Sequence, residues 1–396
     1  MLPVVIAGAG PTGLMCALAL ARQGVRVVVC EAEPNLTHDL RAGTFHPPTQ
    51  EMMAPYGITQ RMHEQGLQVR RWQIRSRRDA LVAEFDLGLL ADETPYPYRL
   101  HLEQHRLTPI QLGALRGEPS AEVHFGHRIT GFEQKAGSVL VQFESEGIPG
   151  KIEASWLIGA DGGRSTIRKL LGVEFEGFTW PEQFLVVSTP YDFAQHGFTL
   201  NTYIADPVEW AAVFKMPDAG PPGLWRLAFP CDPGLPDDVL LDPAAVQKRM
   251  QGFLSLSRDY EIKYQSIYRV HQRVASEWRR ERVLLAGDAA HLNNPLGGFG
   301  LNSGIHDAVS LAGKLGAVWR GEAEESVLDL YVRQRRAATI EQVQAMSIRN
   351  KRLLEERDPA VQRSRMEELV AISRDPERSR AFLLESSMIA GLRKAG

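Results

Sequence analysis

Three glycines near the start of the chain have the spacing that a nucleotide-binding turn requires. Gly8, Gly10 and Gly13 belong to GAGPTG, a GxGxxG pattern that directly follows a short apolar run. The first glycine allows a tight turn, the second lets a pyrophosphate approach the backbone, and the third lets the next helix pack on the strand. We expect this turn, which includes Thr12, to bind the pyrophosphate of a dinucleotide at a helix N-terminus.

An acidic residue follows the glycine turn at the distance expected for a ribose ligand. Glu31 comes eighteen residues after Gly13, at the end of the apolar run VRVVVC over 25–30, and 14–22 is predicted to be a helix. A carboxylate at the end of such a second strand can accept hydrogen bonds from ribose hydroxyls. The alternative is a glycine-rich turn with a surface glutamate, but a strand, turn, helix and strand in register favour dinucleotide binding.

Two later segments also bring polar groups to the end of an apolar strand. In LIGADGGRSTIRKLLG, over 157–172, the strand leads to Asp161, and a turn with a helix capped by Ser165 is the alternative interpretation. In the second segment, RVLLAGDAA leads to Gly287 and Asp288, where a carboxylate can bind a polyol hydroxyl. The glycine-rich loop 295–300 then leads into a helix predicted over 301–314, whose N-terminus can face an anionic or carbonyl-like group, although a simple turn and capped helix is possible here too.

The elements that must position these groups alternate between α/β and antiparallel patterns. Alternating runs over 72–85 and 121–143 predict strands, the latter a hairpin or three-stranded ribbon, and 50–65 looks helical. We therefore expect an α/β protein with a Rossmann-like nucleotide-binding domain, an inserted and mostly antiparallel β-sheet domain, and a C-terminal helical tail. The expected boundaries are 1–70, 101–174 and 276–330 for the first domain, 71–100 and 175–275 for the second, and 331–396 for the helices.

Composition excludes several classes of function. The 396 residues carry 45 basic and 48 acidic side chains, a formal net charge of −3, so no basic field suggests nucleic acid or an anionic membrane as a partner. Three cysteines at scattered positions suit a reducing cytoplasm and form neither a disulfide framework nor a metal site. The start of the chain does not look like a signal peptide, and no apolar run reaches the ~18 residues of a membrane span.

Taken in order, the three motifs resemble a known family. GAGPTG with Glu31, GADGGRSTIR over 159–168 and LLAGDAAHLNNPLGGFGLN over 284–302 look like the three fingerprints of the single-component flavoprotein aromatic hydroxylases, the para-hydroxybenzoate hydroxylase family of class A flavoprotein monooxygenases. The resemblance covers nearly the whole chain. It implies non-covalent FAD, NADPH or NADH as electron donor, and hydroxylation of a small aromatic or N-heteroaromatic substrate by O2 through a flavin C4a-hydroperoxide.

The same resemblance implies roles for individual residues. The three glycines of the first motif would accommodate the pyrophosphate, and Glu31 would bind the adenosine ribose. The arginine of Arg41-Ala42-Gly43 is similar to one that contacts FAD near its ribose and pyrophosphate, and Gln104 is similar to a glutamine that reaches the side of the flavin. Further cofactor-binding positions are Asp161 with Arg164 or Arg168, Gly287, Asp288, Pro295, Gly300, Leu301 and Asn302. The last four would lie beside the flavin ring, where backbone N–H groups stabilise negative charge on the reduced ring.

Substrate residues are expected on the inserted sheet and on loops close to the flavin. Tyr191, Tyr203, Lys215 and Trp225 stand on strand-like stretches and are our substrate candidates together with Pro295, ordinary sheet packing being the alternative for the first four. No catalytic triad is assigned, because the flavin carries the chemistry. His46, in RAGTFHPP, either faces the active site and acts on a phenol proton or is a plain loop histidine, and His291 is expected to be structural.

Other functions remain open at this point. A flavin-dependent reductase or epoxidase-type relative would share the same motifs, and a non-catalytic flavin-binding redox protein would share the fold. The charged C-terminal helices are expected to present a solvated face, with a homodimer contact as the alternative.

Overall fold

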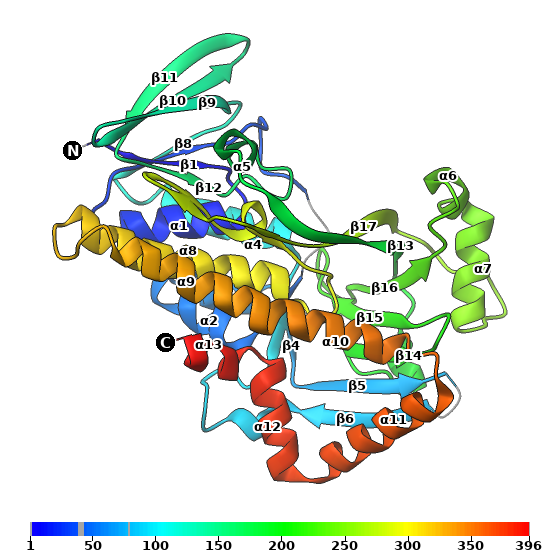
Figure 1. Cartoon of the computed structure of the whole chain (residues 1–396). Coiled ribbons are helices and arrows are strands. Elements are labelled where there is room, and N and C mark those ends of the chain that lie inside the picture. The colour runs from blue at the N-terminus through cyan, green and yellow to red at the C-terminus, as the bar shows by residue number, and fades with distance from the viewer. Residues whose placement is uncertain (1, 39–42, 78–79, 396) are drawn as a thin grey trace.

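The computed structural model describes residues 2–38, 43–77 and 80–395, and its N-terminal part is built on a six-stranded sheet (Figure 1). Strand order is β18-β19-β12-β1-β2-β8, and every pair is parallel except β18 with β19. The strands are β1 (Val4–Ala7), β2 (Val27–Cys30), β8 (Ala121–His124), β12 (Trp156–Gly159), β18 (Arg279–Arg280) and β19 (Val283–Leu285). The four strands other than β8 and β18 are buried along their whole length, as parallel strands covered on both faces must be.

Helices cover one face of this sheet and an antiparallel ribbon covers the other. The helices α1 (Pro11–Ala21), α4 (Gln104–Leu115) and α8 (Phe299–Trp319) lie on one side, where α1 packs against α8 (Figure 1). On the other side lies the ribbon of β9 (Arg128–Lys135), β10 (Ser138–Ser145) and β11 (Ile148–Ala154). The ribbon expected over 121–143 is therefore shifted, because 121–124 pair in parallel with β2 at the edge of the main sheet.

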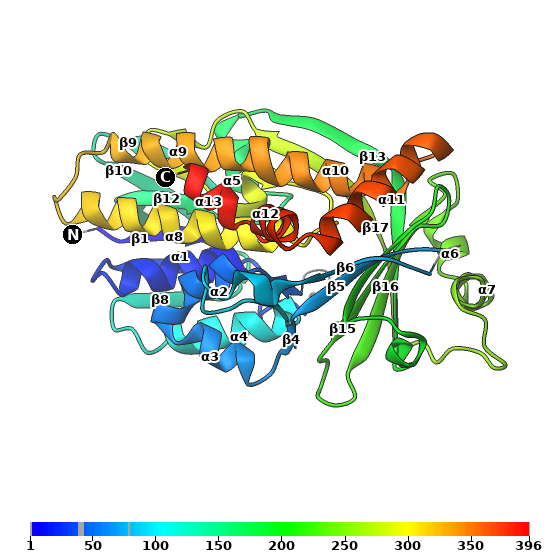
Figure 2. The same ribbon diagram turned by 90° about the horizontal axis from the view of Figure 1, so that it is seen from below.

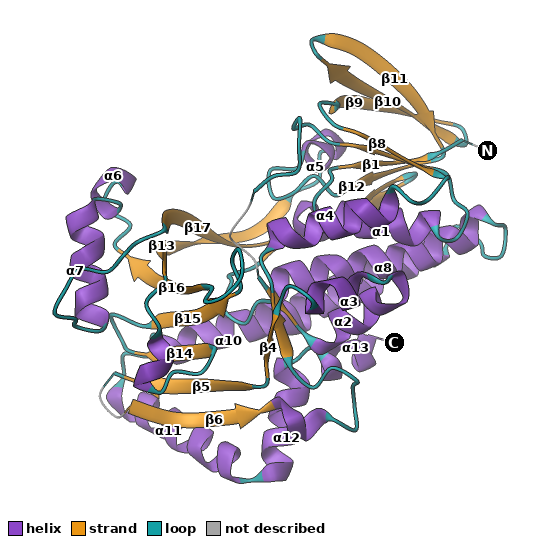
Figure 3. Cartoon of the chain, turned by 180° about the vertical axis from the view of Figure 1, so that it is seen from behind, coloured by secondary structure: helices purple, strands orange, loops and turns teal. Residues whose placement is uncertain are grey.

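A second sheet of eight strands forms the other half of the molecule (Figure 3). It has the order β20-β17-β13-β16-β15-β14-β5-β6, and its pairs are antiparallel except β14 with β5. Its strands are β5 (Arg71–Ser76), β6 (Ala80–Asp86), β13 (Phe175–Thr189), β14 (Asn201–Ala205), β15 (Ala211–Met216), β16 (Leu224–Cys231), β17 (Tyr264–Ala275) and β20 (His291–Leu292). We propose that this sheet is the core of the substrate-binding unit predicted over 71–100 and 175–275.

The two faces of the large sheet are buried against different parts of the chain. On the outer face, α7 (Pro243–Phe253) covers a cluster that includes Trp225 and Phe229 (Figure 3). On the inner face, a cluster that includes Trp72 and Tyr203 packs against the C-terminal helices. Because successive residues of a strand point to opposite faces, neighbours in the sequence fall into different cores.

A small sheet links the two halves. It consists of β3 (Thr44–Phe45), β7 (Arg99–His101) and β4 (Leu67–Val69), in the order β3-β7-β4. The helical segment expected over 50–65 is divided into α2 (Pro47–Met53), a short 3-10 turn and α3 (Ile58–His63). The division falls at Gly57, whose positive φ of 71° ends the turn.

The C-terminal helices connect both sheets. The helices α9 (Val327–Ala338) and α10 (Ala345–Leu354), joined by the π-helical turn η5 (Thr339–Gln344), form a long rod that follows α8 and reaches β14 (Figures 1 and 2). Three further helices, α11 (Pro359–Arg374), α12 (Pro376–Ser386) and α13 (Ile389–Ala395), turn back toward α9. No helix among the described residues has both the length and the apolar character needed to cross a bilayer.

Candidate active site at the carboxyl ends of the parallel strands

The three sequence motifs meet at one edge of the six-stranded sheet. Strands β19, β12, β1 and β2 are adjacent and parallel, so the residues that follow them lie side by side. In that order the residues are Asp288, Asp161, Gly8 and Glu31. Strands β2 and β12 lie on opposite sides of β1, so the strand order reverses there. Open α/β sheets bind ligands at such a switch point.

Close packing explains two of the glycines in the first turn. Gly8 has a φ of +100°, and a Cβ there would lie 2.6 Å from the carbonyl oxygen of Ala160. A Cβ at Gly13 would lie 2.0 Å from the carbonyl oxygen of Gly8. At Gly10, by contrast, a Cβ would meet no atom within 4 Å. Gly10 therefore borders open space, as expected of a backbone that a ligand must approach.

Glu31 and Thr12 hold the first turn in place. The Glu31 carboxylate accepts hydrogen bonds from the backbone N–H groups of Ala9, at 2.7 Å, and Glu33, at 2.9 Å. Thr12 packs where β-carbons at Gly287 and Gly304 would collide with its hydroxyl, at 2.5 and 2.4 Å. Thr12 thus joins the first motif to the third, and in this structure it contacts protein on that side.

The Asp161 carboxylate organises the start of α5 (Thr166–Leu171). It accepts hydrogen bonds from the backbone N–H groups of Thr166 and Ile167, at 2.6 and 3.1 Å, and from the Ser165 hydroxyl, at 2.5 Å. Ser165 itself caps this helix by accepting from the Arg168 backbone N–H at 3.0 Å. The helix capped by Ser165 is therefore present, and Asp161 stands at the strand end, where its contact with a cofactor stays a prediction.

Arg168 fastens the second motif to the third. Its guanidinium donates to the carbonyl oxygens of Ala289 and Gly163, both at 2.8 Å, and lies 3.7 Å from the centre of the Phe175 ring. These contacts make Arg168 a positioning residue for the turn that carries Asp288.

Two carboxylates belong to the turn after β19: one on the turn is exposed to solvent, and one in α8 is buried and hydrogen-bonds the turn. Asp288 is exposed, whereas Asp307 in α8 is completely buried. Asp307 accepts hydrogen bonds from the Gly287 backbone N–H at 3.0 Å, His291 Nε2 at 2.8 Å and Arg335 Nε at 2.7 Å. Burial alone would raise the pKa of Asp307, but Arg335 and His291 outweigh it and hold that pKa below its ordinary value. His291 thus makes structural contacts of the predicted kind.

The glycine-rich loop before α8 is held from both halves of the molecule. His46, completely buried at the start of α2, approaches the Gly297 carbonyl oxygen with Nε2 at 2.8 Å and stacks on Phe299. On the other side, the Gly297 backbone hydrogen-bonds the hydroxyl of Tyr203 in β14. Asn302 accepts from the His46 backbone N–H at 2.9 Å and donates to Thr44 and Gly298 carbonyl oxygens.

The His46 ring is neutral, and its hydrogen bond to Gly297 fixes which ring nitrogen carries the proton. Burial first, and Arg99 next, hold the pKa of His46 well below its ordinary value. Because a carbonyl oxygen only accepts, Nε2 of His46 carries the ring proton, and Nδ1, which has no partner among the described residues, is an acceptor. His46 is a buried residue that contacts the third motif, and its action on a phenol proton stays a prediction.

The remaining predicted cofactor positions lie around this loop or outside the described residues. Pro295 and Gly298 close the loop through a backbone hydrogen bond of 2.9 Å, and Gly300 and Leu301 form the first turn of α8. Gln104 is the first residue of α4, a helix that also contacts α1. Arg41 falls outside the described residues.

These features fit FAD. Gly10 and Gly298 are the N-cap residues that precede the helices α1 and α8, and neither N-terminus has a side-chain cap. Their free N–H groups suit a pyrophosphate at α1 and the carbonyl edge of a flavin ring at α8. Gly10, with open space beside it, follows β1, and the exposed Asp288 carboxylate follows β19 at the same edge of the sheet.

Of the four substrate candidates other than Pro295, one faces this site, and Tyr191 lies in the loop that follows β13 rather than on a strand as expected. Tyr203 lies on the inner face, 5.7 Å from Phe214 between ring centres, and is in contact with the Gly297 backbone. Lys215 and Trp225 lie on the outer face, where the Lys215 ammonium is 5.2 Å from the Trp225 ring. Tyr191 packs at that same face against Phe193 and Tyr260. The alternative of ordinary packing describes these three, because strand alternation turns Lys215 and Trp225 away from the glycine-rich loop 295–300, and Tyr191 packs in a loop at that same outer face.

Sequence reasoning missed a group of basic side chains beside the loop. Arg99 and His101 extend from β7 toward His46 and Phe214, and Arg226 on the inner face of β16 is near His101. Burial lowers the pKa of His101 to about 4, so this ring is neutral. The alternation of RLHLE, with polar residues at every second position, was the available signal.

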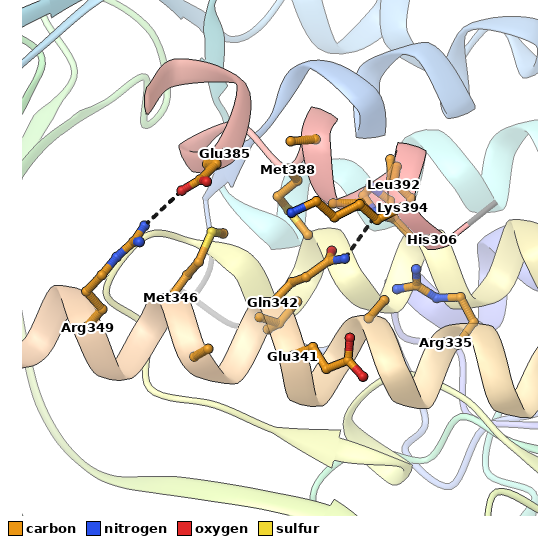
Figure 4. A pocket seen from close by; sticks show the side chains of 15 residues that line it. His306, Arg335, Glu341, Gln342, Met346, Arg349, Glu385, Met388, Leu392 and Lys394 are labelled. Carbon is orange, nitrogen blue, oxygen red and sulfur yellow. Dashed lines mark hydrogen bonds and ion pairs between the residues drawn. The ribbon is translucent and has the colours of Figure 1, made fainter. Parts of the chain in front are cut away.

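A separate cavity of about 250 Å³ lies between the π-helical turn and the last two helices (Figure 4). The side chains that line it include Glu341, Gln342, Met346, Arg349, Glu385 and Met388. Its polar groups largely pair with one another, as Arg349 with Glu385 at 3.6 Å and Gln342 with the Gly391 carbonyl oxygen at 2.9 Å. It contains none of the three motifs, so we place the active site at the strand ends instead.

Comparison with known proteins shows the family of the chain. Residues 1–346 match the FAD binding domain family. Over 98% of its length the chain is 36% identical to a para-nitrophenol 4-monooxygenase of Pseudomonas sp. strain WBC-3, of which it covers 96%. It is 34% identical to 6-hydroxy-3-succinoylpyridine 3-monooxygenase HspB of Pseudomonas putida, with 90% of each chain covered.

Solved structures give the same result. The crystal structure of p-nitrophenol 4-monooxygenase PnpA from Pseudomonas putida DLL-E4 superposes with a TM-score of 0.93 at 33% identity, and 98% of each chain is covered. The flavin-dependent monooxygenase PieE, solved with FAD and substrate, has a TM-score of 0.81 at 25% identity over 98% of this chain and 72% of its own. The predicted reaction class is confirmed over the reductase and non-catalytic alternatives. The chain belongs to the FAD-dependent aromatic hydroxylases, the class A flavoprotein monooxygenases that use FAD and a reduced nicotinamide.

Proposed function

We propose that the substrate is a phenol or hydroxypyridine with a substituent opposite its hydroxyl, and that oxygen is inserted at the substituted carbon. The names of two relatives support this position. In para-nitrophenol 4-monooxygenase, position 4 carries the nitro group opposite the hydroxyl. In 6-hydroxy-3-succinoylpyridine 3-monooxygenase, position 3 carries the succinoyl group, opposite the 6-hydroxyl. Both relatives match the chain over 90% or more of its length.

The chemistry of such a ring explains the shared position. A ring hydroxyl, above all when deprotonated, directs electron density to the carbon opposite, which is where an electrophilic oxygen adds. With O2 and NAD(P)H, one oxygen atom enters the ring and the other leaves as water. The ring hydroxyl and the new hydroxyl each lose a proton, and the substituent departs with its bonding electron pair. The ring product is a quinone.

The observation that carries this proposal is a pair of polar side chains that contact the backbone of Gly297, in the glycine-rich loop 295–300. His46 offers an unpartnered Nδ1 acceptor, and Tyr203 offers a hydroxyl that burial keeps protonated by raising its pKa. An acceptor and a hydroxyl that both contact one loop can hydrogen-bond a bound phenol and orient its oxygen. Phe214 supplies an aromatic wall next to Tyr203.

Bound FAD would supply the oxygen-transferring chemistry, and the chain positions the reactants around it. Gly8, Gly10, Glu31 and Asp288 would hold the cofactor at the strand ends, and the first turn of α8 would face the flavin ring. His46, Tyr203 and the inner face of the large sheet would keep the substrate ring against the flavin and away from water.

Product analysis tests the proposed position. FAD-loaded protein is supplied with NADPH or NADH, 18O2 and 4-nitrophenol. We expect faster nicotinamide oxidation, release of nitrite and one 18O atom in the quinone. A nitrocatechol that retains its nitro group would contradict oxygenation at the substituted carbon, and no turnover with any para-substituted phenol would contradict the substrate class.

Two further predictions from the sequence accompany this proposal. We propose a reducing, cytoplasmic setting, with Cys16, Cys30 and Cys231 present as free thiols. We also propose a homodimer with contacts through the charged C-terminal helices, and light scattering of the FAD-loaded protein measures the mass that tests it.

A further inference from the structure

Arg99 lies in β7 of the small sheet β3-β7-β4, on the face that is turned toward the Gly297 loop. In the pairing of β3 with β7, Phe45 is opposite Leu100 and Thr44 is opposite His101. Phe45 and Leu100 are both completely buried in the core of the N-terminal half. Because strand residues alternate, Arg99 and His101 extend from the other face, toward the Gly297 loop and the large sheet.

The Arg99 guanidinium is buried and has no anionic partner among the residues that the structure describes. Only 2% of the residue is exposed, and two of its nitrogens, Nε and Nη1, have no hydrogen-bond partner in the described part of the chain. The guanidinium makes a cation–π contact with Trp72, its central carbon lying 5.0 Å from the centre of the ring. The acidic residue that follows most closely along the chain, Glu103, accepts from the Asp218 backbone N–H at 2.8 Å.

The neighbours of Arg99 do not balance its charge. His46 and His101 are neutral because burial lowers the pKa of each, and Tyr203 is neutral because burial raises its pKa. Both histidines also have a buried ring nitrogen without a partner among the described residues, Nδ1 of His46 and Nε2 of His101. Arg226 adds a second buried guanidinium near His101.

A buried charge without a partner is unfavourable, because the protein interior replaces neither its hydration nor its counter-ion. Proteins retain such groups where a ligand supplies the partner. We propose that Arg99 binds an oxygen anion borne by the substrate ring, so that the substrate class is aromatic anions. The anion is either a carboxylate substituent or the phenolate itself, and both would pair with the guanidinium in the same way.

Its surroundings assign Arg99 to the substrate rather than to FAD. The phosphates of FAD belong at Gly10 and the start of α1, in the first motif. Arg99 instead lies with Tyr203 of the large sheet, with Trp72, and with His46 beneath the Gly297 loop. The inference rests on the proposed function, since it takes this aromatic face as the substrate pocket.

The experiment measures binding of matched charged and neutral probes to FAD-loaded protein, by the change in flavin absorbance. One pair is 4-hydroxybenzoate with 4-hydroxybenzamide, and the other is 4-nitrophenol with 4-nitroanisole. We expect wild type to prefer the charged member of at least one pair. Arg99→Gln should raise the Kd of that member by about 30-fold or more, equivalent to about 2 kcal/mol, and leave its neutral partner within about 3-fold. The pair that responds identifies the anion.

Two variants separate charge recognition from structure. Arg99→Lys keeps the charge and should recover part of the lost affinity for the charged probe. Arg71→Gln removes an exposed arginine at the start of β5 and should change neither probe. The inference is overturned if wild type shows no preference for charge, if Arg99→Gln weakens charged and neutral probes equally, or if it releases FAD.

These outcomes are distinct from failure of the proposed function. If wild type oxygenates para-substituted phenols without preference for charge, the role of Arg99 is wrong and the reaction stands. If charged probes bind through Arg99 but no phenol is oxygenated, the role of Arg99 stands and the proposed reaction is wrong.

Discussion

Two buried charges differ in what surrounds them: Asp307 in α8, which contacts the turn of the third motif, and Arg99 in β7, near the Gly297 loop. Asp307 receives hydrogen bonds from Gly287, His291 and Arg335, all within 3.0 Å. Arg99 has two nitrogens without any partner among the described residues. A satisfied buried charge holds parts of the fold together, whereas an unsatisfied one marks a place where a ligand completes the structure.

The difference also separates the scaffold from the variable part of the site. Asp307 joins the turn of Asp288 to α8 and, through Arg335, to α9. If the strand ends hold FAD as we propose, this geometry is needed whichever substrate is used. Within the described part of the chain, no ion pair links Arg99 to such a framework, so we expect it to influence which substrate binds and to have little effect on whether FAD binds.

Replacement of Asp307 should have the largest effect on stability. Asp307→Ala leaves Arg335 buried without its carboxylate, which typically costs about 3–5 kcal/mol. The free energy of unfolding of FAD-loaded protein, from urea titration, should fall by that amount, and FAD should be released more easily. Asp307→Asn keeps the size of the side chain and should lose less. A loss under about 1 kcal/mol for Asp307→Ala would show that the two buried charges do not differ as described.

Acid should reduce stability through the buried neutral histidines. Burial lowers the pKa of His101 to about 4 and of His306 to about 3, whereas in the unfolded chain each titrates near 6.5. Between these values the unfolded state binds more protons, so the free energy of unfolding falls as the pH falls below about 6.5. For His101 the loss is about 2 kcal/mol between pH 7 and pH 5. Urea titrations at both pH values should show a smaller difference for His101→Gln than for wild type.

Removal of the Arg99 charge should leave stability nearly unchanged. Arg99→Met keeps an apolar stem against Trp72 and removes a guanidinium that has no anionic partner, so the free energy of unfolding without substrate should stay within about 1 kcal/mol of wild type or rise slightly. Thermal unfolding of FAD-loaded protein checks this. A loss like that of Asp307→Ala would mean that Arg99 has a structural partner.

Lys215 should have the smallest effect on substrate binding. It is also a buried cation, but it lies over Trp225 on the outer face of the large sheet. Lys215→Met should change the Kd of 4-hydroxybenzoate by less than about 2-fold, because the sheet separates Lys215 from the flavin loop. If it weakened the charged probe as strongly as Arg99→Gln, burial of a cation alone would not distinguish the two faces.

Much of the cofactor site could be predicted because it depends on local spacing. Gly13 is required by its contact with Gly8 within the same strand, turn and helix, and Gly8 itself has a φ of +100°, whereas the contact of Gly8 with Ala160 comes from the neighbouring strand β12. The strand ends at Glu31 and Asp288 follow from apolar runs that must be buried in a parallel sheet. Short-range sterics and burial therefore allowed the proposed FAD site to be predicted from the sequence alone.

The substrate side was decided only by the tertiary structure. Tyr203 and Trp225 both stand on strands of apolar and polar residues, and the sequence shows that neighbours point to opposite faces without showing which face α7 covers. Arg99, His46 and Tyr203 come from β7, the start of α2 and β14, and they meet only when the two sheets pack around the Gly297 loop. Contacts between segments far apart in the chain depend on how the layers pack, and no local pattern encodes that packing.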